Sequence, residues 1–192
     1  MNIADQPVAD RAAIIGAFID RLPAYLATDG LFQPGVAEGV GRWDNVTLTL
    51  GVLLDALGAL AAADAAAAAP LTARLHAAAE RHAPAYAQKL RRELRSAVAV
   101  WRSAVDDLVR EPERATDVWH DAARQRTRAA QLLDELARIG AAPDAEADAA
   151  LAAADAAARP RTTPTGFAGS RADAARFPAE RWWWLWRRPE AD

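Results

Sequence analysis

The chain contains no cysteine, one methionine and one lysine among its 192 residues. The absence of cysteine excludes a disulfide framework, thiolate zinc sites, iron–sulfur clusters and cysteine nucleophiles. Large apolar side chains are also scarce, because 52 of the 100 apolar residues are alanine. An alanine core buries little area per residue, and burial stabilises by about 25 cal/mol per Å². We therefore expect a modest core that tryptophan side chains or a partner must supplement.

The chain has little excess of acidic over basic side chains, since its formal net charge is −3. It is unevenly distributed: residues 1–70 carry a net −5, residues 71–139 a net +3 and residues 140–192 a net −1. A basic middle in an acidic chain is far from the composition of a strongly basic nucleic-acid binder. Arginine supplies 22 of the 23 basic residues, which is typical of GC-rich, bacterial-like coding.

Long hydrophobic runs are nearly absent. The N-terminus has no basic region followed by an apolar run, so we expect no cleaved signal peptide and a cytoplasmic location. Residues 46–63 contain one ionisable residue, Asp55, in mid-segment. Placing a carboxylate at the centre of a membrane span costs about 2.5–3.5 kcal/mol. This segment is therefore interpreted as a central helix of a bundle rather than as a span.

Alanine is the best helix former and strand-forming residues are few, so an all-α fold is predicted. Short connections favour an antiparallel up-and-down bundle of four or five helices. Apolar periodicity and helix breakers place these helices near residues 7–28, 45–69, 84–111, 112–139 and 144–158, with a shorter helix over 71–82. We expect Pro23 to kink the first helix, Asp44 or Asn45 to cap the second, Pro70 to end it, and Gly140 to end the fourth.

Two helices carry a clear apolar face. In the helix over 84–111 the expected core face consists of Tyr86, Leu90, Leu94, Val98, Trp101, Val105 and Leu108. In the helix over 112–139 it consists of Val118, Ala122, Ala129, Leu132, Leu133, Leu136 and Ile139. Residues 30–43 are rich in glycine and are predicted to form a loop.

The composition changes at residue 159. Prolines and glycines from Pro160 to Gly169 indicate an extended linker that leads to a Trp/Arg-rich end. We therefore divide the chain into an alanine-rich helical bundle over residues 1–158 and an extended C-terminal arm over residues 159–192.

The arm holds the most unusual feature of the sequence, because four of the seven tryptophans lie within five residues, next to three arginines. A large aromatic cluster left in water would be a sticky patch, so something should cover it. Three things could cover it: the chain's own bundle, a protein partner or a membrane surface. The membrane is the least favoured, because the Trp-rich stretch is short and has a proline at each end. Tryptophan and arginine are frequent in interface hot spots. The candidate partner-binding residues are Trp182, Trp183, Trp184, Trp186, Arg187 and Arg188.

A second candidate site is a basic strip on the helices over 84–111 and 112–139. If these helices pair near Pro112, Arg95 comes level with Arg128. The strip would bind phosphates of RNA or DNA, and its candidate residues are Arg91, Arg95, Arg102, Arg124 and Arg128. The competing interpretation is that these arginines, with Lys89 and Arg126, form an ordinary solvent-exposed helix face. Acidic residues such as Glu93 and Glu135 would then balance its positive charge.

A metal site is the third candidate. His76 and Glu80 share a helix face, and His120 could meet them between helices. The sequence lacks the Glu-x-x-His pairs of di-iron bundles and the His-Glu-x-x-His spacing of zinc hydrolases. No cofactor is therefore expected.

These observations favour a non-enzymatic protein-binding accessory or scaffold subunit that uses the arm and a helical face, with another protein or a second copy of the chain as its partner. The alternatives are a nucleic-acid-associated subunit that uses the arginine strip and a metal-binding bundle enzyme around His76, Glu80 and His120.

Overall fold

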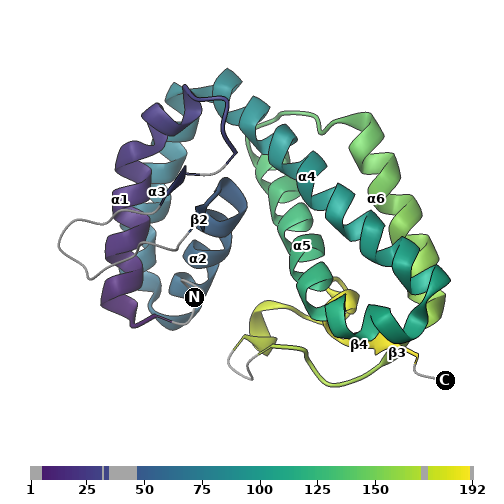
Figure 1. The fold of residues 1–192 in the computed structure, drawn as a ribbon. Coiled ribbons are helices and arrows are strands. Elements are labelled where there is room, and N and C mark those ends of the chain that lie inside the picture. The colour runs from purple at the N-terminus through teal and green to yellow at the C-terminus, as the bar shows by residue number, and fades with distance from the viewer. Residues whose placement is uncertain (1–5, 32, 35–46, 170–172, 191–192) are drawn as a thin grey trace. The chain divides into compact units, whose positions relative to one another are not determined.

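A computed structural model describes residues 6–31, 33–34, 47–169 and 173–190. This part of the chain is all-α, as predicted, and ends in the Trp-rich segment (Figure 1). Its α-helices are α1 (Val8–Leu26), α2 (Leu50–Ala63), α3 (Ala65–Arg81), α4 (Ala83–Arg110), α5 (Pro112–Arg138) and α6 (Ala145–Ala158). Two short antiparallel strand pairs accompany them: β1 (Gln33–Pro34) with β2 (Thr47–Leu48), and β3 (Thr162–Pro164) with β4 (Arg187–Pro189).

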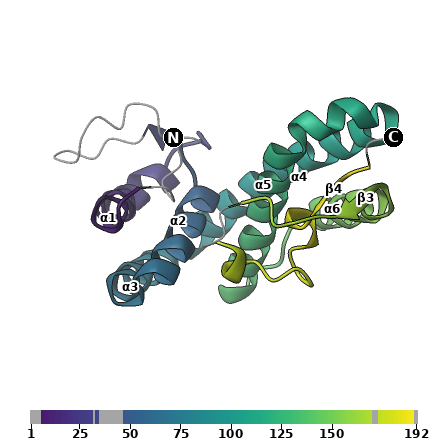
Figure 2. The same cartoon turned by 90° about the horizontal axis from the view of Figure 1, so that it is seen from below.

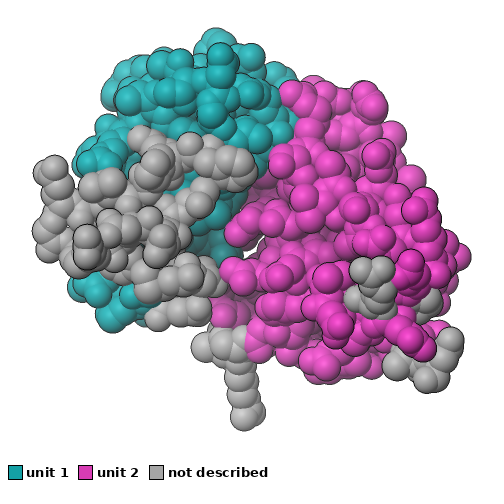
Figure 3. Space-filling view, in the orientation of Figure 1, with its two compact units in different colours: residues 1–93, 134–141 teal, residues 94–133, 142–192 magenta. Residues whose placement is uncertain are grey.

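The chain forms two compact units (Figure 3). The first unit comprises residues 1–93 and 134–141, and the second comprises residues 94–133 and 142–192. Helices α4 and α5 therefore contribute to both units. Residues 159–190 group with the helices of the second unit, and the division at residue 158 stays a prediction about domain organisation.

In the first unit, α1, α2 and α3 pack against one another (Figure 2). Their core is made of the few large aliphatic and aromatic side chains of this part of the sequence. It includes Ile15, Phe18, Leu22, Tyr25, Leu50, Leu53, Leu60 and Leu75, each at most 2% exposed. The alanines of α3 fill the remaining contact positions, because a small side chain lets two helix axes approach closely.

The predicted core face of α4 is confirmed, since all seven of its residues are buried. The face predicted for α5 is wrong at its start, because Val118 is 46% exposed and the neighbouring Trp119 is buried instead. The ring of Trp119 packs at 5.1 Å from the ring of Trp101. A tryptophan side chain buries more area than a valine, so it takes the inward position on this turn.

The predicted helix break at Pro70 is also wrong. Helix α3 runs through Pro70, and the break lies at Asp64, whose φ of −153° is extended. The Asp64 carboxylate accepts a hydrogen bond from the backbone N–H of Ala67 at 3.0 Å and so caps α3. A capping aspartate satisfies an N–H group that the helix itself cannot pair, which fixes the start of the helix before the proline.

Helix α1 ends at Leu26 with Pro23 inside it, and the kink expected at Pro23 stays a prediction. The start of α2 differs from the prediction. Thr49 caps α2 by accepting a hydrogen bond from the N–H of Val52, whereas Asp44 and Asn45 lie outside the described residues. Gly140 does follow α5, with a φ of +67° that favours glycine.

No helix in the described ranges combines the length and apolarity that crossing a membrane requires.

Candidate functional site

The C-terminal segment, residues 159–190, is anchored in the second unit by Trp184. Its side chain is 2% exposed. The indole N–H donates to the hydroxyl oxygen of Thr127 on α5 at 2.9 Å, and the Arg126 guanidinium lies 3.9 Å from the centre of the ring. A buried tryptophan that has both a partner for its N–H and a cation over its face is held firmly.

Arg126 is in turn held by Asp155 of α6. Its Nε and Nη2 atoms donate to the Asp155 carboxylate at 2.7–3.1 Å. The same carboxylate accepts a hydrogen bond from the indole N–H of Trp101 on α4 at 3.0 Å. Asp155 therefore ties α4, α5 and the C-terminal segment to α6. The Arg126 side chain is 11% exposed, so the pair lies in an environment where the loss of one partner is costly.

Two of the other clustered tryptophans pack against Trp184. Trp182 and Trp183 are buried, and both rings meet the Trp184 ring edge-on, at 5.5 and 5.8 Å. The Trp119 indole N–H donates to the carbonyl oxygen of Arg187 at 2.8 Å. The sequence left three possibilities for what shields these tryptophans from water: the chain itself, a protein partner or a membrane. In the structure the chain itself buries Trp182, Trp183 and Trp184. A partner role for Trp182, Trp183 and Trp184 stays a prediction, and it would require the segment to leave its helices.

Trp186 differs from its neighbours because it is only half-buried. Its ring lies 5.2 Å from the half-buried ring of Phe167, and its indole N–H donates to the carbonyl oxygen of Phe177 at 2.7 Å. We call Phe167 and Trp186 the outer aromatic pair. The Phe167 ring also lies against Gly169, where an added Cβ would come within 2.6 Å of it.

The two arginines that follow Trp186 have different surroundings. Arg187 donates from Nε to the Thr162 hydroxyl at 2.9 Å and from Nη2 to the carbonyl oxygen of Thr162, and so fastens β4 to β3. Arg188 is exposed, and its side chain makes no hydrogen bond or ion pair with the described residues. Of the predicted partner-binding residues, Trp186 and Arg188 therefore reach the surface most directly.

The predicted basic strip is only partly assembled. Two of its five arginines, Arg95 and Arg102, line one pocket between α4 and α6. Arg95 pairs with Asp144 at 2.9 Å, and this hydrogen bond, together with backbone N–H donors, lowers the pKa of Asp144. The remaining three, Arg91, Arg124 and Arg128, are half-buried. Phosphate binding by these residues stays a prediction.

Three residues that the sequence assigned to a solvated face, Lys89, Glu93 and Glu135, are buried in the first unit. The Lys89 ammonium donates to the carbonyl oxygens of Thr28 and Gly30 at 2.8 and 2.6 Å, just past the end of α1. Glu93, one turn later on α4, accepts hydrogen bonds from the Thr49 hydroxyl and, at 2.9 Å, from the N–H of Gly51. A cation at a helix C-terminus and a carboxylate at a helix N-terminus both complement the helix dipole. These two side chains therefore clamp α1 and α2 to α4.

Both tyrosines of the chain belong to the same unit and are almost fully buried. Burial, with the nearby Glu93, raises the pKa of Tyr25, and burial, with Glu135, raises the pKa of Tyr86. Tyr86 donates to the Glu135 carboxylate at 2.8 Å. Burial lowers the pKa of Lys89, whose ammonium lies 4.3 Å from the centre of the Tyr25 ring.

These pKa directions predict a loss of stability in alkali. Above the ordinary tyrosine pKa of about 10 the unfolded chain loses phenolic protons that the folded chain keeps, so stability falls as pH rises, by about 1.4 kcal/mol per tyrosine at pH 11. The lowered pKa of Lys89 acts in the opposite direction, but only up to about pH 10.4. Urea unfolding between pH 9 and 11 measures the loss, and the Tyr25→Phe/Tyr86→Phe double variant should show a flatter dependence. Tyrosinate absorption that appears near pH 10 in the folded chain would contradict the prediction.

The three metal candidates lie in different units. His76 and Glu80 lie on α3 in the first unit, and His120 lies on α5 in the second. Glu80 and His120 are exposed. Within the described ranges, no three His, Cys, Asp or Glu side chains are placed so that they could hold a metal ion.

Sequence reasoning missed the roles of Asp155, Arg126, Lys89 and Glu93. Asp155 stands in an alanine-rich helix with no marked neighbour, and its partner Arg126 is 29 residues away. Lys89 and Glu93 have the spacing of an ordinary exposed ion pair on a helix. The one available signal was that Lys89 is the only lysine in an arginine-rich chain.

No family model, no curated protein and no solved structure matches this chain.

Proposed function

We propose that this chain is a non-enzymatic accessory subunit that binds another protein through the outer surface of its C-terminal segment. The observation that carries the proposal is the outer aromatic pair, Phe167 and Trp186, half-exposed beside the exposed Arg188. We further propose that the protein acts in the cytoplasm.

The composition and rigidity of this surface support the proposal. Aromatic residues and arginine are enriched at the centres of protein interfaces. The pair is held by the hydrogen bond from the Trp186 indole N–H to Phe177 and by the stacking of the Phe167 ring on the Phe177 ring at 6.1 Å. Binding through a fixed surface loses less conformational entropy than binding through a mobile tail. Residues 159–192 carry seven basic and four acidic side chains, so an acidic partner surface is favoured.

The other covers considered from the sequence fit this surface less well. Insertion at a membrane surface needs aromatic side chains that reach the headgroup region, whereas Trp182, Trp183 and Trp184 are buried against the chain itself. Binding of nucleic acid by the arginine strip has less support, because Arg95 is already paired with Asp144.

Site-specific photo-crosslinking tests the proposal in the cells that naturally make the protein. A photoreactive amino acid at position 188 should give a discrete cross-linked product, and a second copy of the chain would appear as a product of twice the mass. The matched control carries the same amino acid at Ser103, which is exposed on α4 in the same unit. Equal products from both positions, or none above background from position 188, would refute the proposal.

A further inference from the structure

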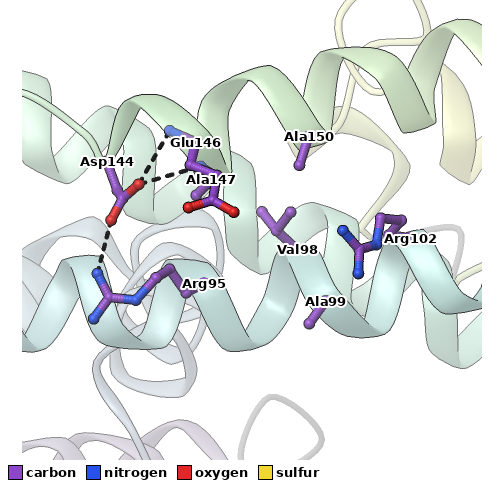
Figure 4. A pocket seen from close by; sticks show the side chains of 8 residues that line it. All are labelled: Arg95, Val98, Ala99, Arg102, Asp144, Glu146, Ala147 and Ala150. Carbon is purple, nitrogen blue, oxygen red and sulfur yellow. Dashed lines mark hydrogen bonds and ion pairs between the residues drawn. The ribbon is translucent and has the colours of Figure 1, made fainter.

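A pocket of about 160 Å³ lies between α4 and α6 in the second unit (Figure 4). Four of the lining side chains, Arg95, Val98, Ala99 and Arg102, come from α4. The other four are Asp144, the residue that caps α6, and Glu146, Ala147 and Ala150 of α6. The pocket is separate from the outer aromatic pair, so the inference drawn from it is independent of the proposed partner binding.

Two of the charged side chains in this pocket, Arg95 and Asp144, pair with each other. Arg95 donates to the Asp144 carboxylate at 2.9 Å. Asp144 also accepts hydrogen bonds from the backbone N–H groups of Glu146 and Ala147 and so caps α6. Because both of these side chains are engaged, they add little affinity for a ligand.

The other pair of charges is available. The side chains of Arg102 and Glu146 are exposed and make no hydrogen bond or ion pair with any residue in the described ranges. In Figure 4 the Glu146 carboxylate and the Arg102 guanidinium lie on either side of Val98. The apolar lining that a ligand can reach comes mainly from Ala99 and Ala150, because Val98 and Ala147 are only 4% and 5% exposed.

We propose that this pocket binds a small zwitterion with a short aliphatic body, such as an aliphatic amino acid. The ligand carboxylate pairs with Arg102, the ammonium pairs with Glu146, and the aliphatic body lies on Val98 and the alanines. A phosphate or another simple anion would be repelled by the carboxylate of Glu146, and a simple cation would be repelled by the guanidinium of Arg102. The volume is below the roughly 300 Å³ of drug-sized sites and equals about five waters, which limits the ligand to a few carbon atoms.

Amide chemical shifts in ¹⁵N-labelled full-length protein test this proposal with three matched probes. Norvaline carries both charges, pentanoate lacks the ammonium, and butylamine lacks the carboxylate. Norvaline should shift the amides of Ala99, Ala147 and Ala150 with a Kd of about 1 mM. Each single-charge probe should bind more weakly, by up to about fivefold, because it loses one exposed ionic contact.

Two substitutions and a control complete the test. Arg102→Ala and Glu146→Gln should each weaken norvaline binding about fivefold. Arg110→Ala should leave it unchanged, since Arg110 is an exposed arginine of α4 outside the pocket lining. The proposal is overturned if norvaline causes no saturable shifts up to about 50 mM, if pentanoate or butylamine binds equally well, or if Arg102→Ala has no effect on a correctly folded protein.

Discussion

Replacing Asp155 with alanine is expected to lower the free energy of unfolding by about 3–5 kcal/mol. The substitution leaves the guanidinium of Arg126 without its counter-charge in a site where that side chain is 11% exposed. It also removes the acceptor of the Trp101 indole N–H. A buried cation and a buried N–H without partners are both costly, because neither regains the water it lost on folding. Urea unfolding at neutral pH, followed by circular dichroism, measures the effect.

Two further variants show whether the buried pair is the cause. Asp121→Ala removes an exposed carboxylate on α5 and should change stability by no more than about 0.5 kcal/mol. The double variant Arg126→Met/Asp155→Leu should recover part of the loss, since replacing both members of a buried pair with apolar residues is often tolerated. A single Asp155→Ala variant as stable as Asp121→Ala would show that the carboxylate does not hold the second unit together.

Deletion of residues 160–192 is expected to abolish cooperative unfolding of the second unit. The deletion removes five buried large side chains, Phe177, Trp182, Trp183, Trp184 and Leu185. Loss of a single buried tryptophan side chain alone costs about 3–5 kcal/mol. The deletion also takes away the ring over which Arg126 lies and the carbonyl oxygen that accepts from Trp119. Amide hydrogen exchange of α4–α6, together with binding of a hydrophobic dye, measures the change.

Substitution of Trp184 dissects that effect within the full chain. Trp184→Ala should cost about 3–5 kcal/mol. Trp184→Phe keeps an aromatic ring and loses mainly the hydrogen bond to Thr127, so it should cost less. A truncated chain that unfolds at the same urea concentration as the full chain would show that the C-terminal segment stabilises nothing.

The deletion alone does not separate stability from partner binding, because it removes the proposed interface as well. Arg188→Glu separates the two. Arg188 is exposed and its side chain makes no polar contact with the described residues, so reversal of its charge leaves the fold intact. If the outer aromatic pair and Arg188 form the interface, this variant weakens cross-linking from position 167 while the urea midpoint stays unchanged.

Local features of the sequence predicted the secondary structure of the second half of the chain well. The apolar spacing from Tyr86 to Leu108 identified α4 and its buried face, and Gly140 marked the end of α5. Prediction was poorer where two local signals competed. The sequence pattern favours Pro70 as the break between two helices, whereas the structure places the break at Asp64. The Asp64 carboxylate caps the start of α3 with a hydrogen bond. Pro70, which lies in an exposed turn, removes only one backbone hydrogen bond from the helix.

Composition and the spacing of neighbours three or four residues apart were enough to predict a helical protein that is poor in large apolar side chains and has its tryptophans clustered near one end. Only the tertiary fold settled that Trp182, Trp183 and Trp184 are buried by the chain itself, that Lys89, Glu93 and Arg126 are buried, and that Asp155 is half-buried beside Arg126. Trp184 meets Thr127 across 57 residues of chain, and Glu93 meets Thr49 across 44. The burial of a charged or aromatic side chain depends on which distant segments fold against it, and helical periodicity carries no information about that choice.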